Sequence, residues 1–183
     1  MGENGGIVFP NPNAPTGIYE SLDHVEEIIK NNPDVIVIVD EAYIDFGGET
    51  ALPLIDKYDN LVVVRTFSKS RSMAGLRIGY AISNPELIKA LNDVKYSYNS
   101  YTMNRPSLVL GVESIHDDAY FREKVGQIIA TRERFVKEIA ELGFTCLPST
   151  ANFVFATHES IPAKEIFAAA KENNIYVRYF DKP

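Results

Sequence analysis

The chain has 183 residues, of which 45% are hydrophobic and 23% are charged, a composition typical of a globular protein with a sizeable core. Its 18 basic and 25 acidic residues give a net charge of −7, which opposes binding to the phosphates of nucleic acids. One cysteine, Cys146, excludes an internal disulfide, and the longest aliphatic run, VIVIV at 35–39, is too short to cross a membrane. Residues 1–6 show no signal-peptide pattern, so we expect a cytoplasmic protein that binds neither nucleic acid nor membrane.

The first half of the chain alternates between apolar runs and polar or amphipathic segments. The apolar runs lie at 6–12, 34–43 and 60–68. Continuous runs of this kind are typical of parallel strands that are covered on both faces. RIGYAIS at 77–83 predicts a fourth strand, and Asn84-Pro85 predicts the start of a helix that reaches about Lys95. The predicted fold class is α/β, with a mostly parallel sheet covered by helices.

From about Arg105 the pattern becomes that of a long helix, with apolar residues at spacings of three and four as far as Leu142. Gly143 is a natural end for that helix. A smaller α+β unit follows, with strands predicted at 144–148, 151–157 and 175–180 and a helix at 163–173. We therefore predict part of a large domain at 1–104, and at 105–183 a bridging helix with a small C-terminal domain.

Functional groups gather where the three predicted parallel strands end. The strands run into NPNAPTG (11–17), into Asp40-Glu41-Ala42-Tyr43 and into Thr66-Phe67-Ser68-Lys69. Ligand sites of open parallel sheets lie at this edge. Each group alone could equally be structural, since acidic residues at strand ends often cap the following turn. Together with Arg77 they supply what pyridoxal 5'-phosphate requires: an amine for its aldehyde, a carboxylate for its ring nitrogen, and arginine and hydroxyl donors for its phosphate.

In order and spacing, NPNAPTG, VDEAY and TFSKSRSMAGLRIGY resemble the fold-type I pyridoxal phosphate enzymes, specifically the class I and II aminotransferases. Within that family, DEAYIDF, AGLRIGYAI, STANFVFA and IYVRYFDKP are most similar to the histidinol-phosphate aminotransferases. The resemblance implies a transferase of histidine biosynthesis. It would move an amino group between histidinol phosphate and a 2-oxo acid such as 2-oxoglutarate, and the full-length parent would be a homodimer.

The same resemblance assigns roles to individual residues. Lys69 becomes the catalytic lysine that binds the cofactor as an imine, Asp40 the partner of the ring nitrogen, and Tyr43 a donor to the ring 3′ oxygen. Ser68 and Arg77 become phosphate ligands. The residue before Pro-Thr-Gly departs from the family pattern, because Ala14 stands where an asparagine usually contacts the ring. Asn13, one residue earlier, is a candidate substitute.

In the smaller unit, Arg178 and Asn152 stand at positions of substrate contacts in the family. Arg178 suits the phosphate of histidinol phosphate, although an exposed arginine on an edge strand is the alternative. Thr157 and His158 follow the ANF segment, where relatives can carry a basic residue, which weakens the substrate assignment. The histidines lack metal-ligand spacing, so no metal site is expected.

Other functions stay open at this point. Two alternatives are enzymes: an aromatic or aspartate-type aminotransferase, and a threonine-phosphate decarboxylase. A third is not an enzyme but a non-catalytic aminotransferase-like module that binds a ligand. The resemblance also implies upstream residues that bind the phosphate and stack on the ring, and a downstream arginine-bearing strand. Because this sequence contains none of these, we expect the chain alone to fold at least in part, to bind the cofactor weakly or not at all, and not to catalyse.

Overall fold

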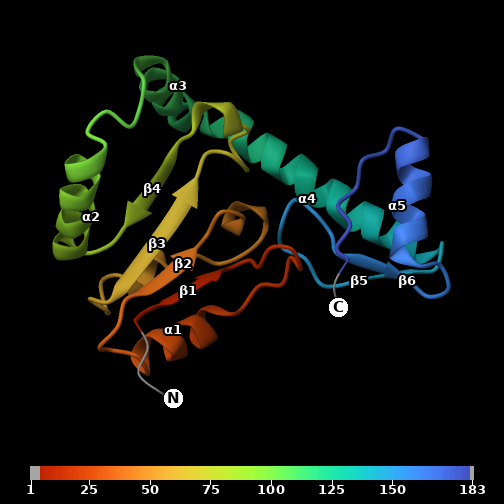
Figure 1. Ribbon diagram of the computed structural model, residues 1–183, viewed down its shortest axis with the longest axis horizontal. Helices are drawn as coiled ribbons and strands as arrows, with labels where there is room; N and C mark the ends of the chain where they lie inside the picture. Colours follow the sequence, from red (N-terminus) through yellow and green to blue (C-terminus); the bar gives the residue numbers. More distant parts are fainter. Residues whose placement is uncertain (1–4, 182–183) are drawn as a thin grey trace.

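In the computed structural model, which describes residues 5–181, four strands form one sheet in the order β1-β2-β3-β4 (Figure 1). The strands are β1 (Ile7–Pro10), β2 (Val37–Asp40), β3 (Leu61–Thr66) and β4 (Gly79–Ile82). The first three are parallel, so the predicted mostly parallel α/β sheet is confirmed. β4 is antiparallel to β3, because the short connection pairs the backbone of Phe67 directly with that of Ile78.

The core of the sheet is aliphatic and lies against α1 (Leu22–Lys30). Ser21 caps this helix by accepting a hydrogen bond from the backbone N–H of His24, and Val25 and Ile29, four residues apart, share its buried face. Burying each such side chain stabilises the fold by about 1.5–3 kcal/mol. The other buried members are Val37, Val39, Ala51, Leu54, Leu61 and Val63. Between β2 and β3 the chain forms two short 3₁₀ helices, Ile44–Phe46 and Leu52–Leu54.

The predicted long helix is interrupted. α2 (Pro85–Tyr98) runs slightly beyond the predicted end, and the region from Arg105 forms two helices, α3 (Arg105–His116) and α4 (Asp118–Ala140). The expectation of one continuous helix from Arg105 is wrong at Asp117, whose carboxylate accepts a hydrogen bond from the backbone N–H of Tyr120 and so caps the start of α4. Gly143, with φ of 87°, follows α4 as predicted.

Beyond α4 the chain forms a small antiparallel pair, β5 (Phe144–Cys146) and β6 (Ala156–His158), with α5 (Ala163–Glu172) beside it (Figure 1). The predicted strand at 151–157 is wrong over most of its length, because Ser149 accepts from Ala151 N–H and donates to the Phe153 carbonyl, which turns the chain. The predicted strand at 175–180 is also wrong. That segment pairs with neither strand, and its Tyr179 stacks on Phe167 of α5 instead.

Contacts at the middle of α4 join the sheet to the small unit. Arg132 donates from Nη1 to the carbonyls of Phe46 and Ala151, at 2.9 and 2.8 Å. The loop after β1 meets the same region, because Thr150 N–H donates to the Gly17 carbonyl at 3.0 Å. A Cβ at Gly17 would lie 2.4 Å from Ser149 Oγ, so glycine is required there.

The predicted division into domains at 1–104 and 105–183 stays a prediction, and residues 1–4 and 182–183 lie outside the described part of both. α3, which that division puts in the second domain, contacts the sheet region through a hydrogen bond from Ser107 Oγ to the Leu76 carbonyl. Within residues 5–181, no helix has the length and apolarity needed to cross a membrane. The same residues contain no cluster of three or more His, Cys, Asp or Glu side chains that could bind a metal ion.

Replacing Arg132 should weaken the junction between the two units. Arg132→Met leaves two backbone carbonyls without their charged donor, so we expect the free energy of unfolding to fall by about 1.5–3 kcal/mol in urea titrations. Arg134→Met, on the exposed side of the same helix, is the matched control and should change it by less than about 0.5 kcal/mol. Equal effects of the two variants would contradict the assignment of Arg132 as a junction residue.

Candidate functional site

The carboxyl ends of β1, β2 and β3 lie level with one another. Asp40 pairs in register with Pro10 on one side and Val64 on the other, so the segments that follow these strands begin at one edge of the sheet. Asp40 is half-buried, and its Oδ1 accepts a hydrogen bond from Ala42 N–H at 3.0 Å. Within residues 5–181 its other oxygen, Oδ2, has no hydrogen-bond partner. One carboxylate oxygen at this edge is therefore available to a ligand.

The neighbouring carboxylate, Glu41, is engaged within the protein. Its side chain is 1% exposed, and its Oε2 accepts hydrogen bonds from Nε and Nη2 of Arg65, at 3.0 and 2.8 Å. Its Oε1 accepts from Ala51 N–H at 2.6 Å, and Thr50 Oγ1 donates to both oxygens. Burial alone would lower the pKa of Arg65, but its hydrogen bonds to Glu41 and the negative charge of Glu41 outweigh burial and raise that pKa. Glu41 is therefore a structural group, and no carboxylate pair forms with Asp40.

The structure brings Lys69 and Tyr43 together. Lys69 follows β3, and its Nζ lies over the Tyr43 ring, 5.1 Å from the ring centroid. On another side, Tyr43 meets Phe153 of the small unit edge to face, at a centroid separation of 5.1 Å. In the described part of the chain, Lys69 forms no ion pair. The amine is thus placed beside a phenol and near the strand end that carries Asp40, without a carboxylate of its own.

Ser68 and Arg77 lie on the same connection between β3 and β4. That connection is folded back by a hydrogen bond from Met73 N–H to the Phe67 carbonyl. Arg77 is exposed, has a left-handed backbone with φ of 57°, and donates from Nη1 to the Ala74 carbonyl at 3.1 Å. The Ser68 hydroxyl has no hydrogen-bond partner among the residues described. Both side chains keep donors available for an anion.

Asn13 is held in its own turn. Its Oδ1 accepts hydrogen bonds from Thr16, at 2.7 Å from the hydroxyl and 3.4 Å from the backbone N–H. In the same loop the buried Asn11 bonds both backbone groups of Glu20, which fixes the course of the NPNAPTG segment. To replace the asparagine absent at position 14, the Asn13 side chain would have to leave Thr16, so that role stays a prediction.

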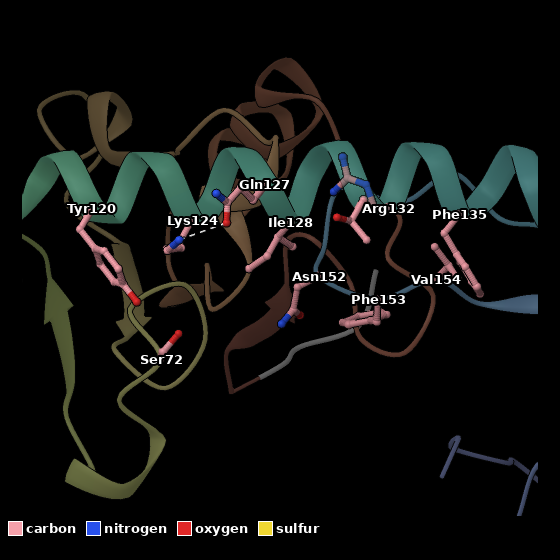
Figure 2. A pocket seen from close by; sticks show the side chains of 11 residues that line it. Ser72, Tyr120, Lys124, Gln127, Ile128, Arg132, Phe135, Asn152, Phe153 and Val154 are labelled. Carbon is pink, nitrogen blue, oxygen red and sulfur yellow. Dashed lines mark hydrogen bonds between the residues drawn. The ribbon is translucent and has the colours of Figure 1, made fainter. Parts of the chain in front are cut away.

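A pocket of about 650 Å³ opens between α4 and the segment 152–154 (Figure 2). Of the predicted site residues only Asn152 lines it, and Phe153, which contacts Tyr43, connects it to the strand ends. Arg178 lies elsewhere, exposed on the segment that forms no strand. The structure therefore places Asn152 close to the site and leaves Arg178 outside the pocket. The remaining lining residues are Ser72, Tyr120, Lys124, Gln127, Ile128, Thr131, Arg132, Phe135 and Val154.

The family model for aminotransferase class I and II matches residues 2–183. The chain belongs to this family. The predicted family is therefore confirmed. The chain spans about half the length of the curated relatives it matches.

Three similar proteins illustrate how far this chain resembles known family members. Histidinol-phosphate aminotransferase 2 of Dechloromonas aromatica is 53% identical over 180 residues, which are 98% of this chain and 51% of the relative. The histidinol-phosphate aminotransferase of Sinorhizobium meliloti, solved in complex with pyridoxal-5'-phosphate, has a TM-score of 0.85 at 28% identity and covers 95% of this chain and 48% of that one. A decarboxylase from Sulfurospirillum multivorans has a TM-score of 0.82 at 30% identity. The match covers 94% of this chain and 52% of the decarboxylase chain.

The interaction between Glu41 and Arg65 is the main feature of this region that sequence reasoning missed. A signal was present, because the ends of neighbouring parallel strands carry opposite charges in DEAY and RTFSK. Asp45 and Ser70 were also missed. They form a hydrogen bond that links the segments after β2 and β3, and nothing in their local sequence marks them as partners.

Removing Arg65 should lower the free energy of unfolding far more than removing an exposed cation. Arg65→Met leaves Glu41 charged and buried without its partner, so we expect the free energy of unfolding to fall by about 3–5 kcal/mol. Lys89→Met, which breaks the exposed pair with Asp93, should change it by less than about 1 kcal/mol. Adding Glu41→Gln to Arg65→Met should recover part of the loss, since no charge then stays buried. A double variant as unstable as Arg65→Met would show that the charge is not the cause.

Proposed function

We propose that this chain carries the catalytic lysine and part of the cofactor site of a pyridoxal-phosphate-dependent aminotransferase. The amino group would move between histidinol phosphate and a 2-oxo acid such as 2-oxoglutarate. The observation that carries the proposal is the position of the Lys69 amine, 5.1 Å from the centre of the Tyr43 ring. The neighbouring strand end supplies the free carboxylate oxygen of Asp40, since Glu41 is engaged by Arg65.

The side chains present fit pyridoxal phosphate. Over residues 5–181, the Lys69 amine, the Tyr43 hydroxyl and the Ser68 hydroxyl form no hydrogen bond, and Asp40 keeps one oxygen without a partner. These are the amine, donors and anion that the cofactor's aldehyde, ring and phosphate require. When bound, the cofactor supplies an electron sink for the carbanion formed at the substrate α-carbon.

Each residue then has a distinct task. The Lys69 Nζ would hold the cofactor covalently, and the same amine would move the proton at the substrate α-carbon. The Asp40 carboxylate favours a proton on the ring nitrogen, because an adjacent negative charge stabilises the protonated form. Tyr43 donates to the ring oxygen, and Ser68 with Arg77 binds the phosphate. Glu41 takes no part, because Arg65 and Ala51 occupy its oxygens.

The substrate assignment rests on the relatives at about 50% identity that are named histidinol-phosphate aminotransferase. A small-molecule amino donor and a 2-oxo acid acceptor are the partners, with Asn152 and Arg178 as substrate contacts. We further propose a homodimer in the cytoplasm as the working form. The structural likeness to a decarboxylase keeps decarboxylation of an amino acid as the second candidate, and assays of amino transfer and of carbon dioxide release separate the two. The chain alone is expected to bind the cofactor weakly and not to catalyse.

Trapping with borohydride tests Lys69 even if cofactor binding is weak. We expect pyridoxal phosphate and borohydride to place a stable pyridoxyl label on the peptide that contains Lys69, and Lys69→Ala to abolish that label and the amino transfer of the complete gene product. Lys57→Ala is the matched control, because Lys57 is exposed and paired with Glu26. Preferential labelling of Lys57 or Lys89 in the wild-type chain would refute the assignment.

Arg178 is tested by comparing two substrates. In the complete gene product, Arg178→Ala should raise KM for histidinol phosphate much more than for histidinol, by a factor that corresponds to about 1.5–3 kcal/mol, because a charge-assisted hydrogen bond to the phosphate is lost. Lys171→Ala, an exposed cation on α5, is the control and should affect both substrates equally. A similar rise of KM for both substrates with Arg178→Ala would show that Arg178 does not recognise the phosphate.

A further inference from the structure

The loop that carries Lys69 is anchored to the segment that carries Tyr43 by one hydrogen bond. Ser70, which follows Lys69 and is 5% exposed, donates from its hydroxyl to Asp45 Oδ2. Asp45 lies in the 3₁₀ helix Ile44–Phe46, and Tyr43 is the residue that caps the start of that helix. The bond therefore joins the two segments close to the point where the Lys69 amine meets the Tyr43 ring.

The carboxylate of Asp45 is in turn attracted by the positive charge of Arg65. Its Oδ1 lies 4.0 Å from Nη1 of Arg65, and Arg65 is held by Glu41 through two hydrogen bonds to Oε2. The order along this chain of contacts is Glu41, Arg65, Asp45 and Ser70. Glu41 is buried and accepts a hydrogen bond from the Ala51 backbone. This series of contacts therefore begins at a residue that is fixed in the protein interior. Asp45 is thus an acceptor that lies within ion-pair distance of a guanidinium held by a buried carboxylate.

The other anchor of the Lys69 loop reaches different elements. Arg71 donates to the Ser114 carbonyl in α3, and its guanidinium lies 4.2 Å from the centre of the Phe121 ring in α4. These contacts hold the loop against the helices and do not involve Tyr43. Within residues 5–181, the hydrogen bond between Ser70 and Asp45 is the only one that links residues 67–72 to residues 43–46.

We propose that Asp45 is a positioning residue, which places the Lys69 amine over the Tyr43 ring by holding Ser70. The proposal deepens the proposed function and rests on it, since the position of Lys69 matters because its amine is the group that reacts. In this proposal Asp45 acts on Lys69 through Ser70 and is given no direct part in binding cofactor or substrate.

The test measures the reactivity of Lys69 without any cofactor. Acetic anhydride is reacted with the folded chain, and mass spectrometry of peptides gives the acetylation rate of Lys69 relative to that of the exposed Lys57 in the same sample. Ser70→Ala and Asp45→Ala should each raise this ratio about two- to fivefold, the size expected from loss of a cation–π contact. The double variant should show no further increase, because both changes remove the same bond.

Two variants serve as controls. Ser107→Ala also removes one hydrogen bond from a buried serine, to the Leu76 carbonyl, and should leave the ratio unchanged. Asp45→Asn keeps an oxygen acceptor for Ser70 but loses the attraction to Arg65, so its ratio should lie between those of wild type and Asp45→Ala. If Ser70→Ala does not fold, Ser70→Cys, with its weaker donor, replaces it and should change the ratio in the same direction. The proposal would be overturned if a Ser70 variant had the same acetylation ratio as Ser107→Ala. It would also be overturned if the effects of Ser70→Ala and Asp45→Ala on that ratio were additive.

A second measurement, the pyridoxyl labelling after borohydride reduction, tests this proposal separately from the proposed function. If wild type labels selectively at Lys69, the Ser70 and Asp45 alanine variants should lose that selectivity while Ser107→Ala keeps it. If wild type labels preferentially at Lys57 or Lys89, the proposed function fails, and the acetylation ratios still report whether Asp45 positions the Lys69 amine. If the Ser70 and Asp45 alanine variants keep the wild-type acetylation ratio while wild type labels selectively at Lys69, the role proposed for Asp45 is wrong and the proposed function stands.

Discussion

The geometry of the candidate site depends on the neutralisation of one buried carboxylate, Glu41. A charge that is removed from water is destabilising by several kcal/mol unless hydrogen bonds and an opposite charge replace its hydration. Arg65, Thr50 and the Ala51 backbone do so here. Since these partners come from β3 and from the middle of the connection between β2 and β3, satisfying Glu41 also fixes how that connection leaves the sheet.

The two adjacent carboxylates consequently differ in role. Successive side chains of a strand point to opposite sides, so Asp40 and Glu41 meet different surroundings although they are neighbours in the sequence. Glu41 forms hydrogen bonds inside the protein, while Asp40 caps its own turn with one oxygen and has no partner for the other among residues 5–181. The positive charge of Arg65 lies on the side of Glu41 and Asp45. No cation of the described chain pairs with Asp40, which leaves its negative charge available to a protonated ring.

The sequence predicted those features that depend on local pattern. Continuous apolar runs located β1 to β3, Gly143 marked the end of α4, and the order of strand ends indicated that Lys69 and Tyr43 would meet. Features that depend on distant partners were not predicted. The segment 175–180 has strand-forming residues but no strand to pair with in the described structure. The helix break at Asp117 depends on a local cap, but the apolar spacing continues through it and does not mark it. Periodicity likewise could not show that Arg132 bonds two separate loops, or that Asp45 faces Ser70.

If Asp40 and Lys69 face one cofactor, the protonation state of the ring nitrogen should depend on Asp40. Pyridoxal phosphate labelled with ¹⁵N in the ring is attached to the chain by borohydride, so that weak affinity does not limit the measurement, and its ¹⁵N chemical shift is followed with pH. A carboxylate beside the ring favours the protonated form, so the pKa of the ring nitrogen should be higher in the wild-type chain than in Asp40→Asn. An equal pKa in the two proteins would mean that Asp40 does not face the ring, and the account of the site would be wrong.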